Sequence, residues 1–337
     1  MAVNTAFTDA CFRRPTDYTP VWFMRQAGRY LPGYKVLRKK HEVLEIAHTP
    51  ELAATVSLEP VDRLGVDAAI LFADIMLVPM AMGVDVKIVD AVGPVIDDPV
   101  AGSQAIERLN AIDASDISFL SDTIRLIKQS AKVPLIGFSG APFTLASYLI
   151  EGRPSRTWIK TKRFMYAEPA LWHALMDKLT RAIGIYLDEQ VHAGVDALQL
   201  FDSWVGCLSP ADFRQYVLPY NRQIFAQLNK HKVPRIMFGT DTGAMLADIA
   251  SVDCEVVGVD WRTDIASAQK LLPNKALQGN LDPAVLLSGW PVVETQTKAL
   301  LDHVPSRTGF IFNLGHGVLP DTSPDTLKGL VDYVHEH

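Results

Sequence analysis

Short apolar runs that stop abruptly at polar residues or glycine recur along the whole chain of 337 residues. Runs of this kind are typical of strands that are buried on both faces of a parallel sheet. Eight such strands are predicted: VWFM from Val21, AAILFAD from Ala68, PLIGFSG from Pro134, ALQLFDS from Ala197, RIMFGT from Arg235, VVGVDW from Val256, ALQGNLD from Ala276 and FIFNLGHG from Phe310. Helical patterns lie between them, so strand and helix alternate.

Several of these helices carry the same start signal, a capping residue followed by proline at the first helical position. The signal occurs at Thr49–Pro50, Ser209–Pro210, Asp282–Pro283 and Ser323–Pro324. The segment Pro169–His192 has apolar residues near helical spacing and ends before Gly194, which predicts a long amphipathic helix.

Eight strands alternating with helices, without a low-complexity linker, predict an α/β fold with one closed (β/α)8 barrel. We expect residues 1–337 to form a single domain. A doubly wound open sheet is the alternative. No G-x-G-x-x-G motif follows an early strand, so the phosphate-binding pattern of a dinucleotide fold is missing.

Composition narrows the possible partners. With Lys+Arg 32 against Asp+Glu 38, the net charge is −6, which argues against general binding to nucleic acid or to an anionic membrane, though not against a locally positive pocket. The three cysteines are far apart and lack CxxC spacing, so neither a disulfide framework nor a cysteine zinc site is indicated. The long apolar stretch 68–84 is broken by Asp74 and Pro79, and the N-terminus lacks the apolar core of a signal peptide. We therefore expect a soluble cytoplasmic protein.

In a (β/α) barrel the active site lies at the carboxyl ends of the strands. The residues that follow the predicted strands are mostly polar. They are Arg25, Arg29, Asp74, Ser139, Asp202, Ser203, Asp241, Asp260, Asn280, Asp282, Asn313 and His316.

Arg25 and Arg29 suggest a polyanionic ligand. A guanidinium is a planar fork of donors that pairs with a carboxylate or phosphate in bidentate fashion. Surface salt bridges are the simpler interpretation for arginines in general. Gly28 lies between the two and would let the backbone approach a ligand closely, which favours the ligand interpretation here.

Asp74 stands between the apolar stretches AAILFA and IMLVPMAM, where a carboxylate needs partners. A helix cap and a catalytic role are both consistent with its position. His316 lies between two glycines, in a loop whose phosphate-binding potential is weak because no lysine accompanies it. Tyr148 fits either core packing or a site.

Two long stretches, PVWFMRQAGR (20–29) and GFSGAPFTLASYLIEG (137–152), resemble the signatures of the uroporphyrinogen decarboxylase family. The stretches LFADIMLVPMAMG, LQLFDSWVG and NLGHGVLPDT follow the family's order, so the resemblance covers nearly the whole chain. It implies a (β/α)8 barrel, usually a homodimer. It also implies a carboxy-lyase of haem biosynthesis that converts the four acetates of uroporphyrinogen III to methyls, giving coproporphyrinogen III, without metal or organic cofactor.

The resemblance also implies roles for individual residues. The loop of Arg25, Gln26, Ala27, Gly28 and Arg29 would hold carboxylates of the substrate, which carries eight of them. Asp74 would accept the pyrrole N–H groups and, with Arg25, serve catalysis. Tyr148, Ser203 and His316 match the remaining substrate contacts, and Arg38 is a further candidate.

Two alternatives remain at this point. A corrinoid-dependent methyltransferase is similar to the same barrel family but activates a thiol on zinc, and the H-x-C pair with a later cysteine that this requires is absent from the sequence. A tetrapyrrole carrier would use the same arginine loop and the same pocket without turnover.

Overall fold

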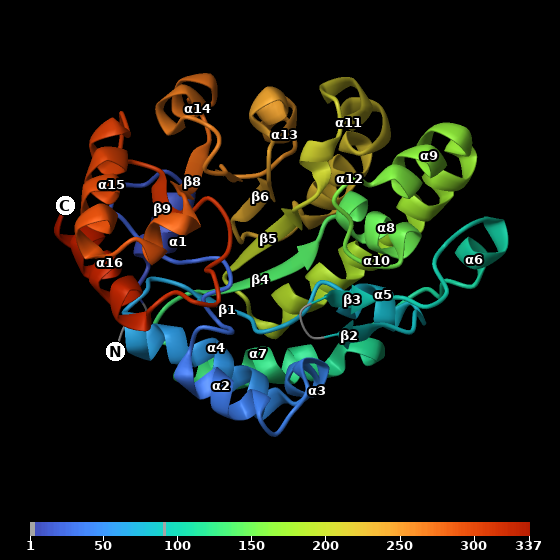
Figure 1. Cartoon of the computed structure of the whole chain (residues 1–337), viewed down its shortest axis with the longest axis horizontal. Coiled ribbons are helices and arrows are strands. Elements are labelled where there is room, and N and C mark those ends of the chain that lie inside the picture. The colour runs from blue at the N-terminus through green and yellow to red at the C-terminus, as the bar shows by residue number, and fades with distance from the viewer. Residues whose placement is uncertain (1–3, 90–91) are drawn as a thin grey trace.

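The structure is a computed structural model that describes residues 4–89 and 92–337. Seven parallel strands form one curled sheet in the order β1-β4-β5-β6-β7-β8-β9, with helices around it (Figure 1). Its strands are β1 (Ala69–Ile70), β4 (Leu135–Gly140), β5 (Ala197–Asp202), β6 (Arg235–Gly239), β7 (Val256–Gly258), β8 (Ala276–Leu281) and β9 (Phe310–Leu314). A separate antiparallel pair joins β2 (Lys87–Val89) to β3 (Gly93–Val95).

Helices connect the strands of the main sheet. The α-helices are α1 (Ala6–Cys11), α2 (Pro32–Arg38), α3 (Val43–His48), α4 (Pro50–Leu64), α5 (Leu77–Ala81), α6 (Ser103–Glu107), α7 (Ser118–Ser130), α8 (Pro142–Glu151), α9 (Ile159–Ala167), α10 (Pro169–Ala193), α11 (Pro210–Tyr216), α12 (Leu218–Leu228), α13 (Leu246–Ala250), α14 (Ile265–Leu271), α15 (Trp290–His303) and α16 (Pro324–Glu336). Short 3-10 helices are η1 (Ala114–Ile117), η2 (Val205–Cys207), η3 (Gly243–Met245) and η4 (Pro283–Leu287).

The predicted start signals are confirmed. Pro50, Pro210 and Pro324 each begin an α-helix, whereas Pro283 begins the 3-10 helix η4. The predicted amphipathic helix is α10, which ends at Gly194 with a φ of 114°, a left-handed conformation that favours glycine. Within the described residues, no helix has both the length and the apolar character needed to cross a membrane.

The predicted first strand, VWFM, is the one that forms no strand of its own in the structure. Only Val21 forms a bridge, parallel to Phe312 of β9. Phe312 N–H donates to Pro20 O at 2.9 Å on one side, and Asp67 N–H donates to Val21 O at 2.8 Å on the other. Residues 20–24 therefore lie between β9 and the chain entering β1, in the eighth position of the barrel.

Side chains bond to several backbone groups of this segment that strand pairing would otherwise use. The segment is therefore not a full strand. The carboxylate of Asp67 accepts the N–H of Val21 at 2.8 Å. Gln26 accepts from Phe23 N–H at 2.9 Å through Oε1 and donates to Ala68 O at 2.8 Å through Nε2. Gln26 thus links the segment to the beginning of β1 and closes the barrel.

Two apolar clusters lie on the two faces of the sheet. The inner cluster takes residues from all eight segments, as expected for a closed barrel. They include Trp22, Ile70, Ile136, Ala197, Ile236, Val256, Ala276 and Ile311. The single (β/α)8 barrel architecture predicted from the sequence is confirmed.

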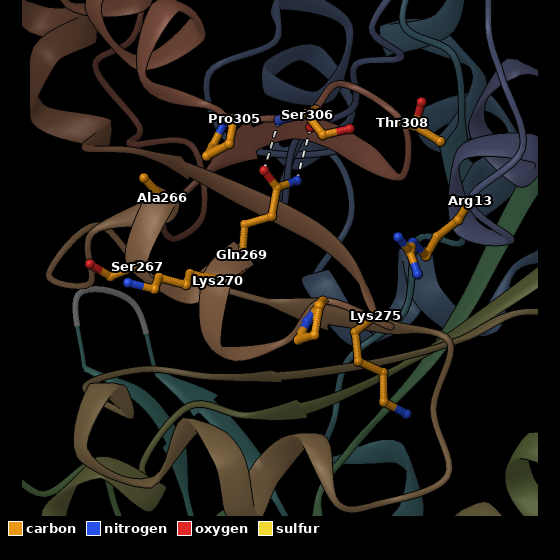
Figure 2. Close-up of a pocket in the computed structure, with 10 residues that line it drawn as sticks. Arg13, Ala266, Ser267, Gln269, Lys270, Lys275, Pro305, Ser306 and Thr308 are labelled. Carbon is orange, nitrogen blue, oxygen red and sulfur yellow. Dashed lines mark hydrogen bonds between the residues drawn. The ribbon is translucent and has the colours of Figure 1, made fainter.

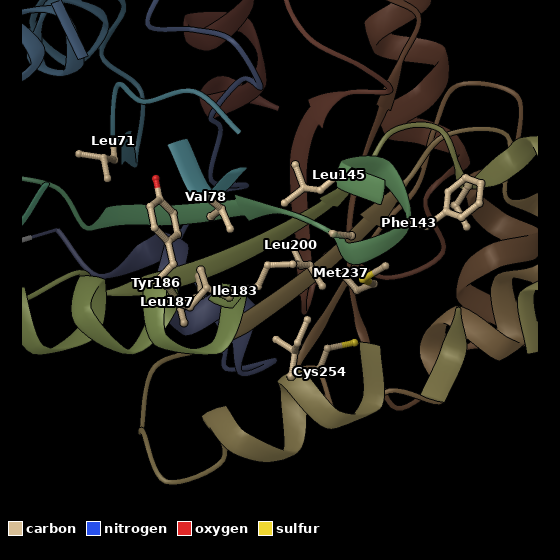
Figure 3. Close-up of a cluster of buried hydrophobic side chains, with 14 of the residues drawn as sticks. Leu71, Val78, Phe143, Leu145, Ile183, Tyr186, Leu187, Leu200, Met237 and Cys254 are labelled. Atoms are coloured by element: carbon tan, nitrogen blue, oxygen red, sulfur yellow. The ribbon is translucent and has the colours of Figure 1, made fainter. Parts of the chain in front are cut away.

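The outer cluster packs the helices onto the sheet. Figure 3 shows Ile183 of α10 below Leu200 of β5, Met237 of β6 beside Leu200, and Tyr186 of α10 to one side, all in the outer cluster. Neighbouring residues of one strand point to opposite faces, so each strand contributes to both clusters. The strands are therefore held in place from both sides, and the residues at their carboxyl ends have a rigid base.

Candidate active site

Arg25 follows the segment at the eighth barrel position and has a φ of 62°, a strained conformation for a residue other than glycine. Its side chain lies against the loop after β9, since a Cβ on Gly317 would come within 2.3 Å of Arg25 Cδ. The neighbouring Val318 N–H donates to Met24 O at 2.8 Å and fixes the two loops together. Burial, followed by the charge of Arg29, lowers the pKa of Arg25, although part of its surface remains accessible.

Asp74 lies at the carboxyl end of the second predicted strand. Its Oδ1 accepts the N–H of Met76 at 2.8 Å, so this oxygen stabilises the turn into α5. Burial raises the pKa of Asp74, while the Met76 hydrogen bond and the charge of Arg25 act against that rise. The carboxylate is thus hydrogen-bonded through one oxygen to the turn and remains partly accessible.

Tyr148 on α8 belongs to the same electrostatic group. Burial and, to a lesser extent, the negative charge of Asp74 raise its pKa to about 12, while Arg25 opposes the change. Its ring lies against Trp204, with 3.9 Å between the ring centroids. The electrostatic interactions therefore place Tyr148 of α8 near Asp74 and Arg25, which follow two different predicted strands.

His316 faces the group from the loop after β9. Burial and the positive charges of Arg25 and Arg262 together lower its pKa to about 4, with burial the largest cause. The imidazole is therefore neutral near pH 7. Its ring packs edge to face with Phe238 and Trp261, at centroid distances of 6.4 and 6.3 Å.

The residues of the predicted substrate loop differ in their burial and in their contacts. The side chain of Gln26 is fully buried in the hydrogen bonds that close the barrel, so its only contact with a ligand would be through the backbone. Ala27 packs on the core, and Arg29 is exposed. A Cβ on Gly28 would meet Arg25 O at an ordinary 3.4 Å, so the chain itself does not require glycine there. Close approach of a ligand remains the predicted reason for it.

Several polar residues at the strand ends hold the loops. Asp260 accepts from Asp241 N–H at 2.6 Å and pairs with Arg262 at 3.0 Å. Asn313 Oδ1 accepts the N–H of Met24 at 3.2 Å. Asp202 is fully buried, and its carboxylate accepts from Thr144 Oγ1 at 2.7 Å. The polar residues that follow the predicted strands therefore lie at the carboxyl end of the barrel. Their polarity alone does not show which of them contact a ligand and which only support loops.

Ser203 keeps a partly accessible side chain, while its carbonyl accepts the hydroxyl of Thr240. Arg38 lies at the end of α2, where it donates to His41 O at 2.6 Å and pairs with Glu42 at 3.3 Å. Arg262 is the residue that sequence reasoning missed. It stacks on Trp261, 4.0 Å from the ring centroid, and contributes positive charge at His316. Its signal was an arginine directly after a predicted strand.

A separate hollow of about 570 Å³ lies at the opposite end of the barrel, before β8 and β9. Figure 2 shows Arg13, Lys275 and Thr308 on its walls, and Gln269 bonded to the backbone of Ser306. None of the predicted site residues lines this hollow, and active sites of this architecture lie at the carboxyl ends of the strands. It is not the candidate active site.

The residues 4–89 and 92–337 contain no group of three or more His, Cys, Asp or Glu side chains arranged to hold a metal ion. Cys11, Cys207 and Cys254 are all free. Burial raises the pKa of Cys207 to about 11, which disfavours its thiolate.

Known proteins similar to this chain agree with its sequence signatures. Residues 2–337 match the family model described as "Uroporphyrinogen decarboxylase (URO-D)". A uroporphyrinogen decarboxylase from Bacillus cytotoxicus is 49% identical over 99% of this chain and 97% of its own length. Another from Bacillus pumilus is 49% identical over 100% of this chain and 96% of its own length.

Solved structures support the fold. A methyltransferase from Methanosarcina mazei matches with a TM-score of 0.76 over 100% of this chain and 99% of that chain, at 19% identity. A B12-independent methionine synthase from Shewanella sp. W3-18-1 matches with a TM-score of 0.57 over 88% of each chain, at 10% identity. At such identities the likeness concerns the fold alone. The family match and the relatives at 49% identity go further: the chain belongs to the uroporphyrinogen decarboxylase family.

Proposed function

We propose that this chain is a uroporphyrinogen decarboxylase, a carboxy-lyase of haem biosynthesis. It converts the four acetate side chains of uroporphyrinogen III to methyl groups and releases coproporphyrinogen III. The observation that carries the proposal is the partly accessible group of Arg25, Asp74 and Tyr148 at the carboxyl end of a barrel of this family. A polyanion with N–H donors at its centre matches this arrangement, in which Arg25 lies near the carboxylate of Asp74 and Arg29 lies near Arg25.

The arginines bind the outer part of the substrate. Uroporphyrinogen carries eight carboxylates, and the guanidinium groups of Arg25 and Arg29 offer bidentate donors to them. The exposure of both Arg25 and Arg29 supports this role. Gln26, Ala27 and Gly28 contribute backbone to the same loop. Local positive charge explains how an acidic protein with a net charge of −6 binds an acidic substrate.

Asp74 binds the centre of the substrate and stabilises the charge that develops there. Loss of carbon dioxide from an acetate leaves an electron pair that needs a sink, and a pyrrole protonated at a ring carbon provides one. The electron pair moves into the ring, a proton is added to the resulting exocyclic methylene to give a methyl group, and loss of the proton from the ring carbon restores the pyrrole. The substrate itself acts as the electron sink, and a preorganised carboxylate stabilises the cationic ring in a water-poor site.

Arg25 acts beside Asp74 in catalysis. Burial and the charge of Arg29 lower its pKa, which makes its guanidinium a stronger acid than a free arginine side chain. Tyr148, Ser203 and His316 complete the substrate contacts through two hydroxyls and one neutral imidazole. The low pKa of His316, about 4, supports a role as a hydrogen-bonding group rather than a cation.

We further propose that residues 1–337 act as one domain and that the protein works as a cytoplasmic homodimer. One sheet takes strands from residues 69–314, which supports a single domain. The free cysteines support a reducing compartment. Sedimentation velocity of the purified protein measures whether it is a dimer.

The test is to incubate the purified protein with reduced uroporphyrinogen under nitrogen and to follow product mass. Successive loss of four carbon dioxide molecules is expected. Substrate that binds without mass loss would favour the carrier alternative instead. Methylation of an added thiol by an added methylcorrinoid, with no loss of carbon dioxide, would point to methyl-transfer chemistry.

A further inference from the structure

A short segment next to the candidate site carries concentrated positive charge. Residues 153–163 contain five cationic side chains and no Asp or Glu, in a chain whose net charge is −6. The five are Arg153, Arg156, Lys160, Lys162 and Arg163. Such a density on an acidic protein creates a local field of the opposite sign.

The charges of this basic segment (residues 153–163) are not neutralised by neighbouring acids. Elsewhere on the surface, cations are commonly paired, as Arg108 is with Asp98 at 2.7 Å. In the part of the chain that the structure describes, the segment's only side-chain hydrogen bond from a cation runs from Lys162 to Cys207 O. The adjacent Glu151 is occupied, because its Oε1 accepts both the N–H and the hydroxyl of Thr161 at 3.0 Å.

The basic segment is next to the candidate site in space. It connects α8 to α9 and enters α9, and these two helices lie in contact beyond the carboxyl end of β4 (Figure 1). Trp158 packs edge to face against Trp204, with 6.0 Å between the ring centroids. Trp204 in turn lies against Tyr148. A continuous row of aromatic rings therefore joins the cations to the predicted substrate contact.

The local geometry of the segment is fixed. Trp158 has a left-handed φ of 49°, and its N–H donates to Ser155 Oγ at 3.0 Å. Its indole Nε1 is buried without a hydrogen-bond partner among the described residues. Ile159 beside it is 66% exposed. The surface thus offers apolar and aromatic area together with cations.

We propose that the basic segment is an outer docking site for the peripheral carboxylates of the tetrapyrrole substrate. The proposal rests on the proposed function, which supplies a ligand with a flat apolar ring and a rim of carboxylates. The cations attract the rim and the row of Trp158, Trp204 and Tyr148 guides the ring inward, towards Arg25 and Asp74. Charges at the rim of a site mainly change the association rate and its salt dependence.

Two triple variants of equal charge change test this inference. Arg153→Gln, Arg156→Gln and Lys160→Gln together remove three cations from the basic segment. The matched control combines Lys132→Gln, Lys232→Gln and Lys270→Gln. These exposed lysines precede β4, β6 and β8 at the opposite end of the barrel, and their side chains make no ion pair within the described residues.

The readout is stopped-flow association of uroporphyrin, the fluorescent oxidised macrocycle, at increasing salt. In the basic-segment variant, the association rate constant at low salt should fall about tenfold and depend less on salt, with little change in dissociation. The control should change it less than about twofold. The docking site would be ruled out by any of three results. These are equal effects of the two triple variants, an unchanged association rate in the basic-segment variant, or no binding of uroporphyrin by the unmodified protein.

The salt dependence of kcat/KM for uroporphyrinogen provides a second measurement, and it should be shallower for the basic-segment variant alone. The same slope in both triple variants would count against the docking site. An unmodified protein that binds uroporphyrin but never releases carbon dioxide would refute the proposed function and leave the docking result to stand by itself.

Discussion

Arg25 and Asp74 each counteract the effect of burial on the other. Burial lowers the pKa of Arg25, and the negative charge of Asp74 acts against this change. Burial raises the pKa of Asp74, and the positive charge of Arg25 acts against that change. The two charges lie on loops that follow different barrel segments. Each therefore helps to keep the other ionised in a site with little water.

Arg25→Gln should shift the pH dependence of the reaction as well as slow it. Without the guanidinium charge, the pKa of Asp74 rises further, so the carboxylate is protonated at higher pH. The acid limb of the profile of kcat/KM should move upward by about 1 pH unit. Arg29→Gln is the control, because Arg29 acts on Arg25 and should weaken binding without moving that limb. If the acid limb does not move in Arg25→Gln, the charge of Arg25 does not control the pKa of Asp74.

Gly317→Ala should reduce activity without reducing stability. The added Cβ would lie 2.3 Å from Arg25 Cδ, and the flexible side chain is the part that moves. A misplaced catalytic group costs on the order of 100-fold in rate, so kcat/KM should fall by that order while the Tm stays unchanged. Gly102→Ala is the control, since a Cβ there meets nothing within 4 Å. A large fall in Tm for Gly317→Ala would indicate a structural role instead.

Gln26→Leu should lower the free energy of unfolding. The substitution leaves Phe23 N–H and Ala68 O buried without their partner, at a cost of about 1–3 kcal/mol for each. Urea unfolding followed by circular dichroism measures the loss, with Gln296→Leu on the exposed surface of α15 as control. Equal stability of the two variants would show that Gln26 does not close the barrel energetically.

Asp202→Asn should make stability less dependent on pH. Burial raises the pKa of Asp202 to about 7 from an ordinary 3.8. The contribution of this side chain to the free energy of unfolding is therefore fully present below pH 3.8 and is lost as the pH rises through 7. The difference amounts to about 4 kcal/mol at most. The variant should therefore match the unmodified protein near pH 4 and exceed it in urea unfolding at pH 8. If Asp202→Asn is less stable than the unmodified protein at pH 8, the fold requires the ionised carboxylate of Asp202.

The barrel could be predicted because its inner and outer faces are both apolar, which leaves a clear pattern of short runs in the sequence. The exception, VWFM, is equally apolar. Its pairing is replaced by the side chains of Asp67 and Gln26, and no local pattern reveals a hydrogen bond between residues 46 positions apart.

The candidate site was predictable in part for a similar reason. Position after a strand pointed to Arg25, Asp74, Ser203 and His316, and family resemblance added Tyr148. The same rule could not tell that Asp260 and Asn313 support loops, because that depends on which backbone N–H groups lie nearby in the folded chain. It also could not predict that the side chain of Gln26 points into the barrel wall.

The most direct test of the account compares Asp74→Asn with the unmodified protein in two measurements on uroporphyrinogen under nitrogen. Single-turnover release of carbon dioxide should slow by about 100-fold or more, because the variant lacks the charge that stabilises the protonated ring. Substrate affinity should change by less than about tenfold, since the arginines and the shape of the site remain. Equal losses of rate and affinity would contradict a role for Asp74 in the transition state.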